Sequence, residues 1–309
     1  MQATFPWKYL RLHSRDEDTR RSPPVARYRN NLVRAILCIH PARLKERTLQ
    51  TALSQRHNLL FVASQDTVHV FEPEYPNQSL IQGPILVIVL PRTAVRRRGH
   101  INPSHPHAIN HLIVSDLGND EILLLACDDG DVIAFRVRSI RRAAQRDLNE
   151  TVCPAPGLDA YFIENVGLSA WGLAVHKGAR LIAVSANTHE ITVFAFALRN
   201  GSSSDSDPDT DNNATFIRAL QQNSKWNAVE KPYDPEQRSL RNLKVCLTGH
   251  YTNIPSIAFC NSETDRDGRF LASTDIAGNT FVWDVWRQTR VENFLSSEGD
   301  RLDRHFDGS

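Results

Sequence analysis

The chain has few cysteines, and none of them stands at a spacing that binds zinc or defines a disulfide framework. There are five among 309 residues, all far apart along the sequence: Cys38, Cys127, Cys153, Cys246 and Cys260. Because no C-x-x-C pair is present and the count is odd, neither a zinc ribbon nor a disulfide-stapled domain is predicted. We expect these thiols to be reduced and buried, and we expect no bound metal and no cofactor.

Long apolar runs are also missing. The most apolar segment, Pro84–Pro91, has about half the length that a membrane-spanning helix needs. Residues 1–21 lack the apolar core of a secretory signal, and their mixed charges do not suit a transit peptide. We therefore expect an intracellular protein with no membrane segment.

No excess of one charge sign is present either. Lys and Arg total 36 against 35 Asp and Glu, which gives a formal net charge of +1 and no overall attraction to nucleic acid or anionic membranes. Several enzyme motifs are absent too, among them G-x-S-x-G, the P-loop, the dinucleotide-binding glycine series and H-E-x-x-H. We expect a protein that is not an enzyme, has no small-molecule substrate and makes no direct contact with nucleic acid.

What the sequence does contain is a repeated succession of short β-rich runs separated by turn residues. Hydrophobic residues make up 41% and charged residues 23% of the chain, as in soluble globular proteins. Each unit has four predicted strands, and a sheet of this kind can bury both of its faces only by stacking on neighbours. The pattern predicts an all-β, WD40-type β-propeller with about four recognisable blades. An unrelated β-sandwich with similar strand spacing is the alternative.

The four units divide the chain between a first segment, a set of blades and a tail. The predicted strands are 32–39, 59–64, 67–72 and 85–90; 109–114, 122–127, 132–137 and 161–163; 171–175, 181–185, 191–197 and 243–247; and 254–259, 270–273, 280–283 and 291–295. The predicted blades occupy about residues 31–91, 107–165, 168–248 and 249–295. Three segments are expected to be partly disordered or flexible, because their composition is too polar to offset the entropy of ordering: 1–30, the acidic insert at about 200–216, and 296–309.

An aromatic residue recurs in the third strand of each unit. These residues are Phe71, Phe135, Phe194 and Trp283, and each follows an aliphatic strand and a small or polar turn. Closed WD40 propellers most often have about seven blades and need at least about four. Since the last recognisable unit ends close to the end of the chain, we expect an open or partial propeller whose terminal strands need covering.

The most specific motif lies in the last unit, where a Gly-His dipeptide precedes a Trp-Asp dipeptide at the spacing of a WD40 repeat. The residues predicted to form this structural motif are Gly249, His250, Ser273, Asp275, Trp283 and Asp284. In WD40 repeats the histidine, a Ser or Thr, a turn aspartate and the tryptophan form a hydrogen-bond network that stiffens the blade. The usual aspartate position is taken by Ala277, and Asp275 comes two residues earlier, so the completeness of the network stays open.

Two stretches, Leu168–Leu198 and Leu247–Trp286, resemble a family of fungal WD40 proteins described as regulators of ribonucleotide reductase gene transcription. The resemblance implies a nuclear or nucleocytoplasmic scaffold that acts with other proteins in deoxynucleotide supply and the DNA-damage response. A substrate receptor of a cullin-type ubiquitin ligase is an alternative, and a propeller hydrolase is a further one. Such receptors often carry W-D-x-R, but here Arg287 stands one place late.

Four histidines lie close together between the first two units: His100, His105, His107 and His111. No cysteine or carboxylate stands at a recognised ligand spacing, so a Pro-rich connection between blades is favoured over a metal site.

The basic runs Arg92–Arg98 and Arg136–Arg146 have no interleaved aromatics, which favours solvated blade edges over phosphate contacts or nuclear-import signals. Serines and a threonine beside aspartates in residues 201–215 suit an acid-directed kinase, with a passive solvated loop as the alternative.

Overall fold

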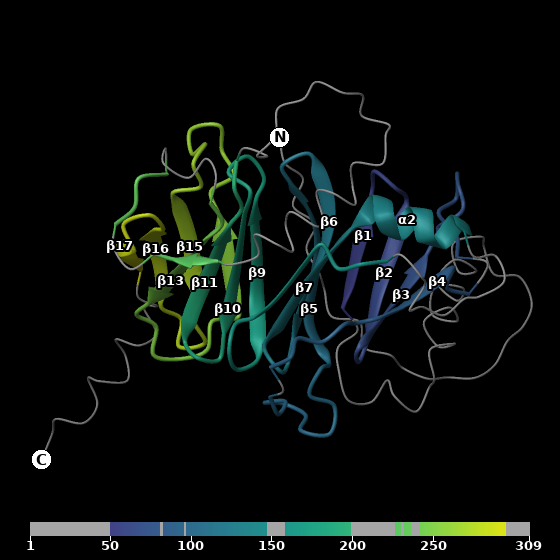
Figure 1. The fold of residues 1–309 in the computed structure, drawn as a ribbon, viewed down its shortest axis with the longest axis horizontal. Coiled ribbons are helices and arrows are strands. Elements are labelled where there is room, and N and C mark those ends of the chain that lie inside the picture. Colours follow the sequence, from purple (N-terminus) through teal and green to yellow (C-terminus); the bar gives the residue numbers. More distant parts are fainter. Residues whose placement is uncertain are drawn as a thin grey trace, which may run out of the picture.

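A computed structural model describes residues 50–80, 83–95, 97–146, 158–198, 226–229, 232–235 and 241–294. These residues form four β-sheets, with four strands in the first, second and fourth sheets and five in the third. Figure 1 shows the sheets side by side, with the first and the fourth at opposite ends of the row. The all-β class predicted from the sequence is confirmed.

Strands that follow one another in the sequence are antiparallel neighbours in each sheet. The first sheet contains β1 (Thr51–Ser54), β2 (Leu59–Ser64), β3 (Thr67–Phe71) and β4 (Leu86–Val89). The second contains β5 (Ile109–Leu117), β6 (Asp120–Cys127), β7 (Asp131–Arg136) and β8 (Phe162–Asn165). The third contains β9 (Ala170–His176), β10 (Leu181–Ala186), β11 (Glu190–Ala195), β13 (Leu243–Thr248) and the short β12 (Asn227–Ala228), which is parallel to β13. The fourth contains β14 (Ser256–Phe259), β15 (Phe270–Thr274), β16 (Thr280–Asp284) and β17 (Thr289–Phe294).

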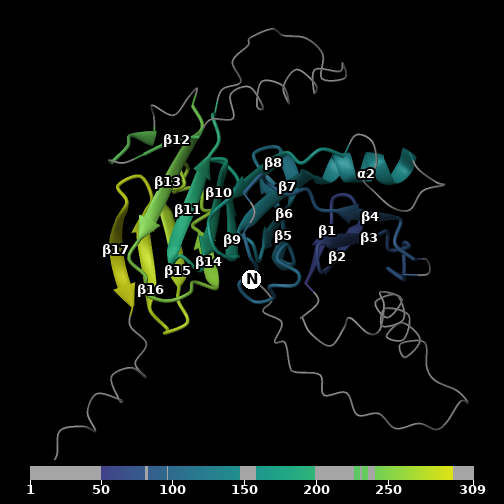
Figure 2. The same ribbon diagram turned by 60° about the horizontal axis from the view of Figure 1, so that its bottom comes forward.

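Every predicted strand within the described residues overlaps an observed one, but three elements were not predicted: β1, the helix α2 (Val137–Arg146) and the short strand β12. The first strand of the first sheet is β1, whereas the strand predicted at 32–39 lies outside the described residues. The helix α2 follows β7 directly, and its residues Val137 and Ile140 are buried in the core between the first two sheets. The views agree that α2 lies beside the first sheet (Figures 1 and 2). No helix in the described part of the chain is long and apolar enough to cross a bilayer.

Apolar residues of facing strands form a separate core between each pair of neighbouring sheets. Phe135 packs between the first and second sheets, Phe194 between the second and third, and Trp283 between the third and fourth. Phe71 packs with Val62 on the face of the first sheet that points away from the second. In the second, third and fourth sheets the recurring aromatic residue of the third strand thus faces the preceding sheet. Burial of each such side chain stabilises the fold by about 1.5–3 kcal/mol.

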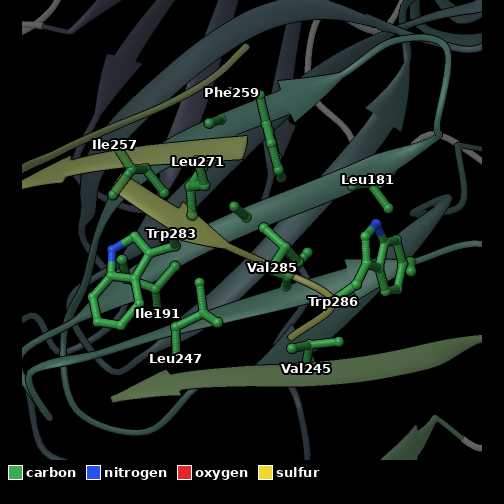
Figure 3. Packing of buried hydrophobic residues seen from close by; sticks show 14 of the residues in the cluster. Leu181, Ile191, Val245, Leu247, Ile257, Phe259, Leu271, Trp283, Val285 and Trp286 are labelled. Carbon is green, nitrogen blue, oxygen red and sulfur yellow. The ribbon is translucent and has the colours of Figure 1, made fainter. Parts of the chain in front are cut away.

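Figure 3 shows the core between the third and fourth sheets, where Trp283 lies beside Ile191 and Leu247. The far side of the fourth sheet ends at β17, all of whose residues are exposed. Figure 2 shows β17 at the outer edge of the row of sheets. An exposed strand of this kind offers unpaired backbone groups to a further strand.

Two sequence interpretations are wrong in the described residues. Cys127 is buried as expected, but Cys246 and Cys260 are exposed; Cys38 and Cys153 lie outside the described residues. The run from Arg136 is not a wholly solvated edge. The Arg136 side chain is buried, its Nε lies 3.2 Å from an oxygen of Asp120, and its guanidinium stacks on the ring of Tyr161.

Candidate functional site

The fourth sheet contains a buried hydrogen-bond network at the end where β15 turns into β16. The Trp283 indole N–H donates to Ser273 Oγ at 2.8 Å. Ser273 Oγ lies 2.7 Å from His250 Nε2, and His250 Nδ1 lies 2.9 Å from a carboxylate oxygen of Asp275. Because the indole can only donate, the serine hydroxyl donates to Nε2 and the histidine donates from Nδ1 to the carboxylate. One tautomer of neutral histidine therefore satisfies every group in the chain of hydrogen bonds.

Asp275 completes this network although it stands two residues before the usual position. Its carboxylate accepts further hydrogen bonds from the backbone N–H groups of Ala277 and Asn279 at 3.0 and 2.9 Å. Gly278, at φ +86°, allows the turn to wrap around the carboxylate. Burial raises the pKa of Asp275, but the hydrogen bonds from His250 and Asn279 outweigh burial and hold this pKa below its usual value.

The other two predicted motif residues have different surroundings. Gly249 has φ +148°, and a Cβ there would lie 3.1 Å from the Trp283 ring, so glycine lets the chain pass the indole. Asp284 is buried at the opposite end of β16, and its carboxylate is hydrogen-bonded outside the His250 network. It accepts hydrogen bonds from Arg269 Nε at 2.7 Å and from the backbone N–H of Arg287 at 3.1 Å.

A second histidine–aspartate pair occupies the corresponding end of the second sheet, and the sequence interpretation missed it. His107 is buried, with Nδ1 2.7 Å from Asp129 and Nε2 3.0 Å from the Pro91 carbonyl. The other three histidines of the cluster do not join it: His100 and His105 are exposed, and His111 Nδ1 lies 3.0 Å from the Trp171 carbonyl. The missed signal was a histidine shortly before the first strand of a sheet, paired with an aspartate in the turn between the second and third strands of that sheet.

His107, Cys127 and Asp129 have ligand atoms that all lie within 4.8 Å of one another. A cysteine and a carboxylate therefore do lie beside one of the histidines, contrary to the sequence interpretation. Both ring nitrogens of His107 already face oxygen acceptors. Burial raises the pKa of the Cys127 thiol, and the charges of Asp129 and Asp131 raise it further, which opposes the thiolate that a metal needs. The arrangement favours a structural pair like His250 and Asp275 over a metal site.

These arrangements suit a scaffold that holds its surface loops in fixed positions better than they suit a catalytic site. In the described part of the fourth sheet, the polar atoms of the His250 network are buried and bonded to one another. The connections next to the network are exposed by contrast. Tyr251 is 84% exposed and Ile276 is 67% exposed, and the N–H of Ile276 donates to the carbonyl of Asn253 at 2.9 Å, so the two connections are neighbours.

Comparisons with known proteins agree with this architecture. The model of a family described as CRT10 matches residues 22–305 of the chain. A WD repeat-containing protein of Schizosaccharomyces pombe is 26% identical over 235 residues, which cover 75% of this chain and 38% of that protein. A WD40 repeat-containing protein of Dictyostelium discoideum is 24% identical over 234 residues, covering 76% of this chain and 24% of that protein. A chain in the crystal structure of the mitotic checkpoint complex is 12% identical with a TM-score of 0.43, covering 80% of this chain and 49% of that one.

The family match and the WD-repeat relatives confirm both the predicted WD40-type β-propeller and the family resemblance noted in the two sequence stretches. The chain spans 38% and 24% of the lengths of these two curated relatives.

Proposed function

This chain belongs to the CRT10 family, and from that membership we propose that it is a non-catalytic adaptor in the transcriptional control of ribonucleotide reductase genes. In this role it holds other regulatory proteins together during the DNA-damage response, in the nucleus or moving between nucleus and cytoplasm. The observation that carries the proposal is the family match over residues 22–305 of a WD40-repeat scaffold.

The structure supports the adaptor part of this proposal through the contrast between buried networks and exposed connections. The His250 network fixes the end of the fourth sheet, while Tyr251 and Ile276 lie exposed on two neighbouring connections beside it. Neighbouring exposed apolar side chains on a rigid support are typical of surfaces that bind proteins. We assign these two side chains to the contact with a regulatory partner.

Affinity purification with quantitative mass spectrometry tests the proposal. The wild-type chain is compared with a Tyr251→Ser/Ile276→Ser variant in cells that express it. We expect the wild-type chain to recover transcription regulators, and the variant to recover less of them. Recovery of a cullin and its adaptor instead would favour the ubiquitin-ligase alternative, and recovery of no stoichiometric partner would contradict the adaptor role.

A control variant separates loss of a surface from loss of the fold. Val89→Ser also removes an exposed apolar side chain, but from β4 of the first sheet. We expect this variant to recover the same partners as the wild-type chain. Equal losses in the control and in the double variant would show that loss of the fold, and not of the contact surface, causes the effect.

A further inference from the structure

The connection between β4 and β5 contains no strand in its described residues, 90–95 and 97–108, and buried carboxylates fix its backbone at several of them. Asp131 accepts hydrogen bonds from the backbone N–H and the hydroxyl of Thr93, at 2.9 and 2.6 Å. Asp128 Oδ2 accepts from the backbone N–H groups of Ile101 and Asn102, at 2.9 and 3.0 Å. Both carboxylates are buried: Asp128 lies in the turn between β6 and β7, and Asp131 is the first residue of β7. Removing a carboxylate from water is costly, so these donors are needed to stabilise it.

Two further residues restrict the shape of the same connection. The buried ring of His107 bridges Asp129 and the carbonyl of Pro91, which lies at the start of the connection. At Gly99 an added Cβ would lie 2.5 Å from the carbonyl oxygen of Asn102, so only glycine fits this close approach. The connection is therefore a preformed surface and not a flexible linker.

The exposed side chains of this connection include both apolar and basic ones. Val95 is 47% exposed and Ile101 is 48% exposed. Arg97 and Arg98 are exposed, and neither forms an ion pair with another described residue. A surface that combines exposed aliphatic side chains with guanidinium groups that have no ion-pair partner among the described residues is suited to a ligand that has carboxylates and an apolar group.

We propose that the β4–β5 connection binds an acidic segment of a partner protein that also carries aliphatic side chains. Carboxylates of the segment pair with Arg97 and Arg98, and an aliphatic side chain covers Val95 and Ile101. The inference rests on the proposed adaptor function and names the chemistry of one partner. The charge complementarity sets the orientation of the partner, and the apolar contact adds affinity.

Other occupants fit this surface less well. Nucleic acid would use the arginines but not the two aliphatic side chains, and residues 90–108 contain no Phe, Tyr or Trp on which a base could stack. The acidic insert of this chain, GSSSDSDPDTDNNA at residues 201–214, contains no Val, Leu, Ile or aromatic residue. A segment of another protein is therefore the favoured ligand.

Selection of peptides from a random display library on the full chain, followed by fluorescence anisotropy on the selected peptides, tests this proposal. We expect enrichment of peptides in which Asp and Glu flank Leu, Ile or Val. Their affinity should fall by at least about tenfold in an Arg97→Glu/Arg98→Glu variant. It should fall also in Ile101→Ser, which alters no charge, and in Gly99→Ala, which alters only the shape of the connection.

The control is Arg142→Glu, which reverses an exposed arginine on α2 outside the connection and should leave affinity unchanged. Unchanged binding by the Arg97→Glu/Arg98→Glu variant would overturn the proposal. Tighter binding of a single-stranded DNA oligonucleotide, or of the peptide 201–214, with the same dependence on the arginines would also overturn it. Each variant's melting temperature is measured first, and Ile101→Ser provides the decision if Gly99→Ala does not fold.

The test of this binding site can fail or succeed independently of the test of the proposed function. Peptides that still bind the double variant would contradict this site but leave the adaptor role intact. Peptide binding that depends on the arginines, in cells whose ribonucleotide reductase transcripts do not respond to the protein, would support this site and contradict the proposed regulatory role.

Discussion

Replacing Trp283 by alanine should destabilise the fourth sheet by about 3–5 kcal/mol, the usual cost of removing a large buried aromatic side chain. Trp283 is 2% exposed and its ring packs edge-on against Phe281, with ring centroids 5.7 Å apart. The hydrogen bond from its indole to Ser273 accounts for about 0.5–1.5 kcal/mol of the loss. Urea unfolding followed by far-UV circular dichroism measures the total, and hydrogen exchange over β15 and β16 locates it.

Trp283→Phe separates packing from hydrogen bonding. Phenylalanine already stands at this place in the second and third sheets, as Phe135 and Phe194. It keeps most of the apolar contact but cannot donate to Ser273, so we expect a loss of about 1–2 kcal/mol. The reasoning would be refuted if Trp283→Ala unfolded at the wild-type urea concentration with unchanged exchange over β15 and β16.

Three further predictions concern single groups in the described structure. The lowered pKa of Asp275 contributes stability at neutral pH that is lost as the pH falls below about 4, so Asp275→Asn should be less stable at pH 7 and show a flatter acid unfolding profile. Burial raises the pKa of Cys246 to about 11. In a chain with Cys38 and Cys153 replaced by serine, iodoacetamide at pH 8 should therefore modify the exposed Cys260 first and the buried Cys127 only after unfolding. Equal rates of modification would contradict this. His107→Ala removes the side-chain donor to the buried Asp129 carboxylate and leaves it, among the described residues, only the backbone N–H of Asp131, which should cost about 1–3 kcal/mol and speed trypsin cleavage in the β4–β5 connection; an unchanged cleavage rate would count against the pinned connection.

The sequence predicted strands well where apolar residues alternate over several positions between turn residues. It failed at β1, because Thr51–Ser54 is only four residues long and its apolar residues show no periodicity. It also missed α2, where Val137 and Ile140 have helical spacing but four arginines dominate the composition. Tertiary packing against the first two sheets decides that this segment is a helix.

The candidate site was predictable in part. The motif around His250 and Trp283 carries its own spacing signal, whereas His107 and Asp129 belong to a connection and a turn that come together only in the folded sheet. Exposure of Cys246 was predictable but missed. In β13 the buried Leu243, Val245 and Leu247 alternate with the more exposed Lys244, Cys246 and Thr248, as the sequence pattern of a strand indicates.

Ribonucleotide reductase transcript levels test the central claim most directly. They are measured before and after DNA damage in cells that lack the protein and in cells that carry either the wild-type chain or the Tyr251→Ser/Ile276→Ser variant at equal abundance. We predict that loss of the protein changes these levels, that the wild-type chain restores them, and that the variant restores them less. Levels that are the same in all three kinds of cell would contradict the proposed function.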